Sequence, residues 1–492
     1  MRVTNTMMMN STLRNVGKSK RNLSDLENQM ATEKKITRPS DDPIVAIRAL
    51  SLRSSLAEIN QYLESNIPDA QSWLEVSESA LTNMDGILSD IYKYCNQGAS
   101  DQFTEKDRSA IVQVLQQYKD ALYSECNADY AGRYCFTGFK TDSSFTFLTD
   151  LDANRKYEID ETFTGSDLDK ATIIRRPVDD NSVSNIDAAD MPDGVTVHRL
   201  RVAYDWCSAD NYSNVTIDGT EYTVTKAVTH EEMQEIAADP GYKDRTNEIY
   251  FVYDTGELVI SDDLYSTFRN AKDIEFTYQK EQFAKGDIRP EMYFDCRDIT
   301  DADNIIEYNQ TEGGQNINYT INFNQSLRVN TLGKDTLSYK IGRDIDDMCN
   351  ALQNVADIET KITKLKSMYD SETYSDADKA SIETMLEACE RELDYATEYM
   401  ESIFSKELTR VTGYQQVVDL QLADLGARSK RLTLTKGRLE EQNTTFEDLK
   451  SKNEDAELED TVIKYSAAAT LYEAALTAAS DCVKQSLLNY IR

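Results

Sequence analysis

The chain has 492 residues, of which 53 are Lys or Arg and 87 are Asp or Glu, so its formal net charge is −34. This length corresponds to about three domains of ordinary size. A surplus of acidic groups this large repels phosphate groups and anionic lipid head groups, which argues against nucleic-acid and membrane-surface binding.

The rare residues exclude further classes of protein. Histidine occurs only at His198 and His230, which argues against enzymes that use imidazole as a base or metal ligand. The eight cysteines form no Cys-x-x-Cys pair, so we expect free thiols. No apolar run is long enough to cross a bilayer, and the first residues lack the apolar core of a Sec-type signal peptide. We therefore expect neither a membrane-spanning segment nor a cleaved signal peptide.

The chain begins with a pattern typical of a coiled coil. Met9, Val16, Leu23 and Met30 recur every seven positions, which predicts a helix with one narrow apolar stripe. We expect this helix to reach about Ile36.

The next residues predict a break between two helices. Pro39 should stop the first helix, because proline cannot continue the hydrogen-bond ladder. Asp42 is a candidate N-cap for the second helix, and Pro43 suits its first position. Helical periodicity then continues to about residue 130, and we expect Pro68 to kink or interrupt it.

The pattern changes to that of β-structure near residue 140. Strand-like segments run over residues 196–204, 215–224, 249–260 and 317–323. Asp218-Gly219 and Thr255-Gly256 are typical of hairpin turns. We predict a β-rich region over residues 140–339.

Helical pattern returns at about Asp344 and continues to the end of the chain. The last helix has apolar residues at steps of three and four, namely Val462, Tyr465, Ala469, Tyr472, Leu476, Ala479 and Val483. One stripe cannot stabilise a helix alone, so the two terminal helices should pair with each other or with other copies of the chain. An ordinary intramolecular helix bundle remains the alternative.

One acidic segment is a weak candidate for calcium binding. Asp150, Asp152, Asn154 and Glu161 occupy positions 1, 3, 5 and 12 of an EF-hand loop. Arg155 replaces the glycine that the loop requires, so an acidic surface turn is the simpler interpretation. We identify no catalytic residue and no cofactor.

These patterns predict a mainly α-helical fold with an inserted β-rich region. Residues 1–40 and 455–492 are expected to form a terminal coiled-coil assembly region, and residues 41–139 and 340–454 a helical rod. Residues 140–339 are expected to form a β-rich variable surface domain.

Several segments near both ends resemble a known family. They are Gln29–Ile36, the Pro-Ser-Asp-Asp-Pro motif at Pro39–Pro43, Asn127–Gly138, Asp424–Arg428 and Glu454–Glu457. The sequence resembles the flagellar hook-associated protein 3 family, the hook-filament junction proteins of the flagellin superfamily. The motif at Pro39–Pro43 favours a junction protein over a flagellin proper.

The resemblance implies a structural protein of the bacterial flagellum that forms a ring between hook and filament. Its implied partners are other copies of itself, another hook-associated protein, flagellin and an export chaperone. The implied location is extracellular, after type III export without a cleaved signal peptide. A filament flagellin, or a secreted acidic β-domain protein that binds calcium or carbohydrate, remains the alternative.

Overall fold

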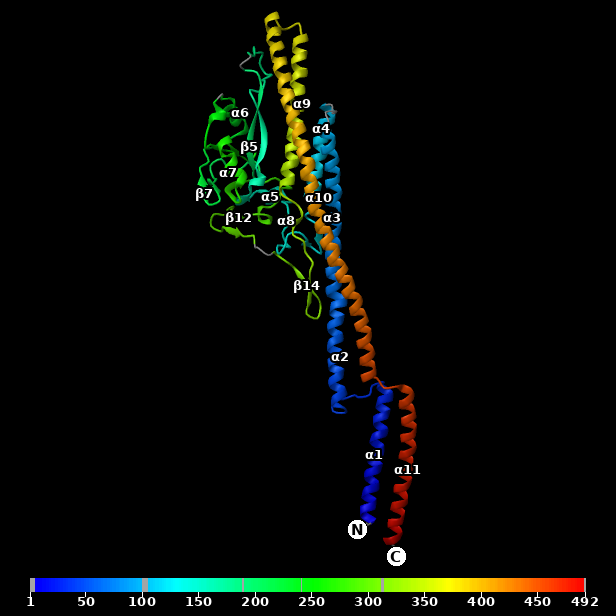
Figure 1. The fold of residues 1–492 in the computed structure, drawn as a ribbon. Coiled ribbons are helices and arrows are strands. Elements are labelled where there is room, and N and C mark those ends of the chain that lie inside the picture. The colour runs from blue at the N-terminus through cyan, green and yellow to red at the C-terminus, as the bar shows by residue number, and fades with distance from the viewer. Residues whose placement is uncertain (1–4, 100–104, 188–189, 240, 311–313, 491–492) are drawn as a thin grey trace. The chain divides into compact units, whose positions relative to one another are not determined.

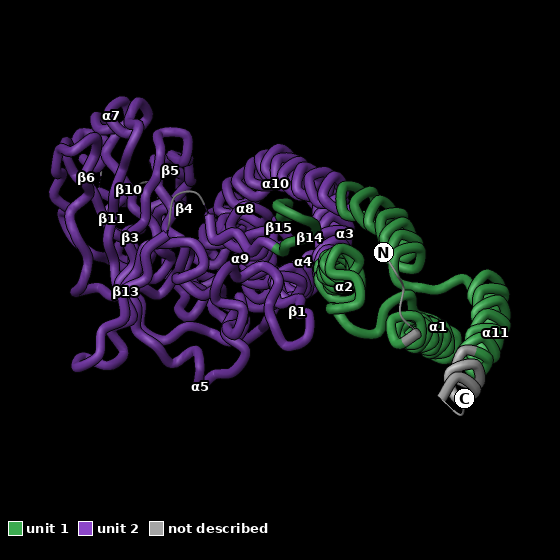
Figure 2. The backbone as a smooth tube through the Cα atoms, turned by 90° about the horizontal axis from the view of Figure 1, so that it is seen from below, with its two compact units in different colours: residues 1–70, 319–327, 430–492 green, residues 71–318, 328–429 purple. Residues whose placement is uncertain are grey.

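The computed structural model describes residues 5–99, 105–187, 190–239, 241–310 and 314–490, and among these it leaves aside the side chains of residues 5, 105–106 and 482–490. The chain forms two compact units, which Figure 2 shows in different colours. Unit 1 comprises residues 1–70, 319–327 and 430–492, and unit 2 comprises residues 71–318 and 328–429.

Long helices dominate both ends of the chain (Figure 1), as expected for a sequence with only 7 Pro and 18 Gly. The α-helices are α1 (Asn5–Thr32), α2 (Pro43–Gln61), α3 (Ile67–Gly98), α4 (Glu105–Glu125), α5 (Asp150–Ala153), α6 (His230–Ala238), α7 (Tyr265–Asn270), α8 (Gly333–Thr336), α9 (Lys340–Asp370), α10 (Asp376–Glu454) and α11 (Leu458–Tyr490). The π-helix η1 is Tyr62–Asn66, and the 3-10 helices are η2 (Gly165–Asp167), η3 (Tyr242–Asp244), η4 (Asp262–Leu264) and η5 (Pro290–Met292).

The strands lie between the helical segments, as the sequence predicts. They are β1 (Asp129–Tyr130), β2 (Arg133–Tyr134), β3 (Lys156–Phe163), β4 (Asp169–Arg175), β5 (Asp193–Arg201), β6 (Val215–Ile217), β7 (Thr220–Tyr222), β8 (Lys226–Val228), β9 (Ile249–Val252), β10 (Glu257–Ile260), β11 (Ile274–Glu281), β12 (Asp295–Asp298), β13 (Ile306–Tyr308), β14 (Asn318–Asn322) and β15 (Gln325–Arg328). One sheet has the order β4-β5-β10-β9-β8 and the other β13-β12-β3-β11-β6-β7, while β1-β2 and β14-β15 form separate pairs.

The two large sheets share an apolar core. On β9, Ile249 and Phe251 point into the core that both sheets line, whereas Tyr250 and Val252 belong to a second core beneath α6. This alternation follows from the two-residue period of a strand. The β-rich region is therefore layered as sheet, sheet and helix.

Both predicted hairpin turns are present. Asp218 and Gly219 join β6 to β7 with φ angles of 47° and 81°, and Gly256 precedes β10 with φ 65°. Positive φ angles cost glycine little, which is why these dipeptides identified the turns.

The predicted interruption at Pro68 takes the form of a π turn. α2 ends at Gln61, η1 follows directly, and α3 begins at Ile67, so the chain stays helical throughout. Proline has no N–H for the ladder, and widening the preceding turn accommodates this loss.

A buried ionic network joins the five-stranded sheet to α9 within unit 2. Arg199 of β5 lies 2.5 Å from Glu257 and 2.6 Å from Asp347 of α9, and Arg201 is paired with Asp347 and Asp344. Burial alone would raise the pKa of Asp347, but the arginines beside it hold this pKa well below its usual value. The charged form of Asp347 therefore depends on both arginines.

The network continues onto α10. Arg410 donates to Asp344 at 2.9 Å and to Glu407 at 2.8 Å, and Tyr414 donates to Asp344 at 2.6 Å. Replacing one charged side chain of this network would leave a buried charge without its partner, which would destabilise the fold. These contacts fix the β-rich layers to the helices of unit 2.

Candidate assembly surface

The two terminal helices pair with each other. α1 and α11 lie side by side in Figures 1 and 2, and the antiparallel bridge between Lys34 and Asp455 sets their relative direction. The four residues of the predicted stripe on α1, which are Met9, Val16, Leu23 and Met30, are all half-buried. The stripe therefore lies on the covered side of α1.

The predicted stripe on α11 is only partly covered. Tyr465, Ala469, Tyr472 and Ala479 are half-buried. Val462 and Leu476 remain 42% and 44% exposed. Val483 lies in α11, but its side chain is outside the described residues.

A neighbouring row completes the covered face of α11. Thr461 and Ala468 are buried and Ala475 is half-buried, and together with Tyr465, Tyr472 and Ala479 they form a continuous row at steps of four and three. This row shares its three other members with the predicted stripe. The heptad pattern alone could not choose between the two rows, because both fit it equally well.

The rest of α11 is also rich in exposed apolar side chains. Ile463 is 68% exposed and Leu471 is 65% exposed, on a side of the helix away from the covered row. A helix that is apolar on most sides is stable in water only when it is enclosed. α1 covers one side of α11 and leaves the others open to a partner.

The connection between the helices is built as an elbow. The α1 helix ends at Thr32, earlier than the predicted end near Ile36, and Glu33 has a positive φ of 57°. The Lys35 N–H then donates to the Glu454 carbonyl at 2.7 Å, and the Ala456 N–H donates to the Glu33 carbonyl at 2.8 Å. Pairing with the other end of the chain thus replaces the helical ladder and stops α1.

A buried carboxylate ties the elbow to α2. Glu454 is 3% exposed, and Arg53 donates to its two oxygens at 2.7 and 2.6 Å. Sequence reasoning missed this pair, because neither residue belongs to an apolar pattern. The only available signal was the position of Glu454 in a segment that resembles the family.

The start of α2 follows the prediction more closely. The Asp42 carboxylate accepts hydrogen bonds from the backbone N–H groups of Ile44 at 3.0 Å and Val45 at 3.2 Å, and Pro43 is the first helical residue. The prediction for Pro39 is wrong as a stop for α1, because α1 ends at Thr32 and Pro39 lies exposed in the connection. Asp42 and Pro43 therefore define the second helix without help from Pro39.

The structure does not bring the four calcium candidates together. Asp150 and Asp152 lie in the short helix α5 and Asn154 follows it, whereas Glu161 is buried in β3. Asp152 pairs with Arg155 and Arg289, and the Glu161 carboxylate accepts from the Ala203 N–H and the Tyr278 hydroxyl at 3.0 Å each. No group of three metal-ligating side chains occurs among the described residues. The EF-hand interpretation is therefore wrong.

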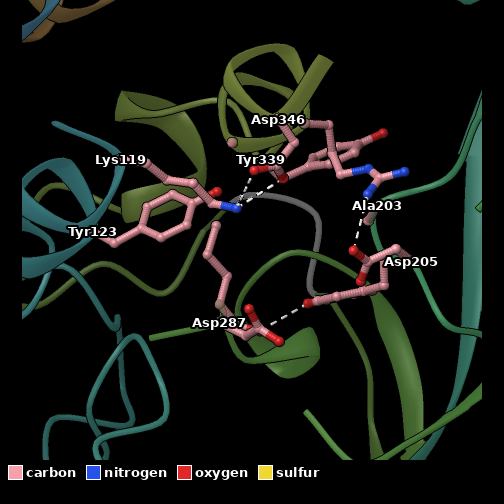
Figure 3. A pocket seen from close by; sticks show the side chains of 11 residues that line it. Lys119, Tyr123, Ala203, Asp205, Asp287, Tyr339 and Asp346 are labelled. Atoms are coloured by element: carbon pink, nitrogen blue, oxygen red, sulfur yellow. Dashed lines mark hydrogen bonds and ion pairs between the residues drawn. The ribbon is translucent and has the colours of Figure 1, made fainter. Parts of the chain in front are cut away.

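Figure 3 shows a small polar cavity between helices and strands of unit 2. Its volume is about 60 Å³, and Lys119, Asp205, Asp287, Arg343 and Asp346 contribute charged groups to its wall. Lys119 pairs with Asp346 at 2.8 Å, and Arg343 lies 3.6 Å from Asp205. The cavity has room for only a few water molecules, so it is too small to be a substrate site.

The sequence predicts free thiols and no membrane-spanning helix, and the structure bears on both expectations. Seven cysteines are free and buried, and the eighth, Cys482, has its side chain outside the described residues. Burial raises the pKa of the Cys95 and Cys349 thiols to about 12, which makes them poor nucleophiles. Among the described residues, no helix is long and apolar enough to cross a membrane.

Comparison with known proteins gives a consistent set of relatives. Residues 3–141 match the bacterial flagellin N-terminal helical region. Flagellar hook-associated protein 3 of Salmonella typhimurium (strain LT2) is 29% identical over 145 residues, which cover 29% of this chain and 45% of the relative. A flagellin of Clostridium tyrobutyricum is 28% identical over 120 residues, which cover 24% of this chain and 32% of the relative.

Solved structures of flagellar proteins also align over most of the chain. The flagellar junction protein FlgL of Legionella pneumophila is 13% identical with a TM-score of 0.28, covering 79% of this chain and 99% of the other. FlgL of Xanthomonas campestris is 13% identical with a TM-score of 0.25, covering 80% of this chain and 99% of the other. These TM-scores are too low for either alignment to support an argument about this chain.

These matches cover only part of this chain and only part of each curated relative. The chain spans less than half the length of the curated relatives it matches. The family match over residues 3–141 includes α1, the elbow and the helices α2, α3 and α4. Residues 3–141 thus match the bacterial flagellin N-terminal helical region, and the chain is similar over 145 residues to flagellar hook-associated protein 3.

Proposed function

We propose that this protein is a structural component of the bacterial flagellum that forms the junction between hook and filament. In this proposal it assembles with copies of itself through α1 and α11. The observation that carries the proposal is the surface of α11, which exposes Val462, Ile463, Leu471 and Leu476 although α1 already covers another side. The resemblance of residues 3–141 to the flagellin N-terminal helical region supports the flagellar setting.

The exposed side chains give assembly its driving force. Burying one large aliphatic side chain contributes about 1.5–3 kcal/mol. Four such side chains exposed on one helix are unfavourable in an isolated monomer, because their apolar surface is in contact with water. Enclosure by neighbouring copies removes this surface from water and stabilises α11 at the same time.

We propose the following division of labour. Residues 1–40 and 455–492 form the assembly region, residues 41–139 and 340–454 form the rod, and residues 140–339 form the outer domain. The elbow between Thr32 and Pro43 and the start of α9 at Lys340 support two of these boundaries. The protein acts by binding its neighbours rather than by catalysis.

The partners and location follow from this role. The ring of copies contacts another hook-associated protein on the hook side and flagellin on the filament side. An export chaperone holds the chain before type III export, and the assembled protein is extracellular.

A filament flagellin is the second candidate, and the match to the Clostridium tyrobutyricum flagellin favours it. The two candidates differ in how far assembly proceeds. Electron microscopy of the purified chain at high concentration should show short assemblies for a junction protein and long filaments for a flagellin.

Deletion of the gene in its host tests the junction role directly. We expect hooks without filaments and flagellin shed into the medium. Wild-type protein and the variant Ser466→Asp, which changes an exposed position on the polar side of α11, should restore filaments. Tyr472→Asp, which places a charge in the covered row, should not restore them. Normal filaments in the deletion strain would refute the junction role.

A further inference from the structure

A patch of large aliphatic side chains lies on the solvent side of α2 in unit 1. Ile44, Ile47 and Leu50 are 64%, 68% and 64% exposed. They are three residues apart and therefore follow one side of the first two turns. Ala46 and Ala49 are buried on the opposite side, and the exposed Arg48 and Ser51 lie beside the three large side chains. We call Ile44, Ile47 and Leu50 the α2 patch.

The described part of the chain offers nothing that covers this patch. Exposed aliphatic side chains in a cluster mark a contact with another molecule. The question is which surface fits them.

A matching surface lies on α11 of the same unit. It follows steps of four, four, three and four along the helix and consists of exposed apolar residues: Ile463, Ala467, Leu471, Ala474 and Ala478. We call these residues the α11 outer row. It is separate from the covered row that faces α1.

The two surfaces are complementary in size. The α2 patch consists of three large side chains, whereas the α11 outer row has three alanines, one between Ile463 and Leu471 and two beyond Leu471. Large side chains of one helix pack into the gaps beside small residues of another. Beside the outer row, the surface of α11 is polar, with Ser466 and Glu473 exposed, and this polar surface separates the outer row from the exposed Val462 and Leu476.

The two surfaces do not cover each other within one chain, because every one of their residues is exposed. We propose that the α2 patch of one copy packs onto the α11 outer row of the next copy. Each copy then offers one patch and one row, which gives a heterologous contact that continues from copy to copy and can close into a ring. This inference rests on the proposed self-assembly and adds a contact outside the α1–α11 pair.

Charge and size substitutions test the contact. Ile47→Asp and Ala474→Phe change exposed positions, so both variants should keep the circular-dichroism spectrum and melting temperature of the wild type. Both should raise the concentration needed for assembly by about tenfold or more, as expected for residues at the centre of an interface. Ser466→Asp on α11 is an exposed control outside the two surfaces and should assemble like wild type.

Cysteine cross-linking identifies the partner. Ile47→Cys and Ala474→Cys are placed in separate copies that also carry Cys482→Ser, since the other seven cysteines are buried. After mixing and mild oxidation, we expect disulfide-linked dimers that contain one copy of each variant, in excess over dimers of either variant alone.

The outcomes separate this inference from the proposed function. If wild type, Ile47→Asp and Ala474→Phe all assemble equally, the contact is wrong while self-assembly stands. If Ile47→Asp assembles normally but fails to retain filaments on cells, the α2 patch binds a different flagellar protein and the second-copy assignment is overturned. If the wild-type protein does not assemble at any concentration, both the proposed contact and the proposed self-assembly are refuted.

Discussion

Glu407 of α10 should make the stability of unit 2 depend on pH. Its side chain is 1% exposed, and one carboxylate oxygen accepts from Arg410 at 2.8 Å while the other has no partner among the described residues. Asp344 of α9 lies against the same Arg410 nitrogen at 2.9 Å, and Arg201 of β5 contacts Asp344 from the sheet side. Burial, together with the Asp344 charge, raises the pKa of Glu407 to about 8, although Arg410 opposes the shift.

The sign of the effect follows from proton binding. The ordinary pKa of 4.5 applies to the unfolded chain, and the folded value is about 8. Between these values the folded state holds more protons than the unfolded state, so stability falls as the pH rises. Each pKa unit corresponds to about 1.4 kcal/mol, so the full shift would amount to about 5 kcal/mol. Partial exposure of Arg410 to solvent reduces this, and we expect a few kcal/mol.

Glu407→Gln tests this reasoning, because glutamine has nearly the same shape and cannot ionise. Urea unfolding followed by circular dichroism between about pH 5 and pH 9 should show similar stabilities at the acidic end and a more stable variant at the alkaline end. Glu398→Gln, an exposed glutamate of the same helix, is the matched control and should follow wild type throughout. Parallel curves for wild type and Glu407→Gln over the whole range would refute the argument.

Three further predictions concern residues of unit 1. Tyr472→Asp should separate α11 from α1, because the covered row cannot solvate a charge, and hydrogen exchange along α1 should then rise; unchanged exchange would contradict this. Asp42→Ala should destabilise α2 by about 0.5–2 kcal/mol in thermal unfolding, whereas Pro39→Ala should have no effect, and equal effects would show that the cap is not the cause. Arg53→Met should leave the Glu454 carboxylate buried without its partner and lower the melting temperature of unit 1, with partial recovery when Glu454→Gln is added; a double variant no better than Arg53→Met alone would contradict the pairing.

Features that depend on neighbouring residues could be predicted from the sequence. The cap at Asp42 and the turn at Asp218-Gly219 depend on backbone groups within three residues, so residue type alone identified them. The stripe on α1 was visible for the same reason, since residues seven apart lie on one side of a helix. Long helices around a β-rich insertion followed from composition and periodicity.

The sequence could not predict which residues meet across long stretches of chain. Arg53 and Glu454 are separated by 401 positions, and no local pattern relates a guanidinium to a particular distant carboxylate. The weak calcium candidate was wrong for a similar reason, because Glu161 is part of a buried strand and its carboxylate accepts a hydrogen bond from Tyr278. A candidate ligand is available only if the fold leaves it in reach of the others.

The choice of face on α11 shows where local information ends. Two heptad rows, one through Val462 and Leu476 and the other through Ala468 and Ala475, satisfy the same spacing and share three residues. Only the position of α1 decides that Ala468 and Ala475 are covered while Val462 and Leu476 are left exposed. The sequence alone determined that α11 is an apolar helix in need of partners. The tertiary structure decided which side the chain itself covers, because burial depends on the path of the whole backbone and not on the spacing of residues along one helix.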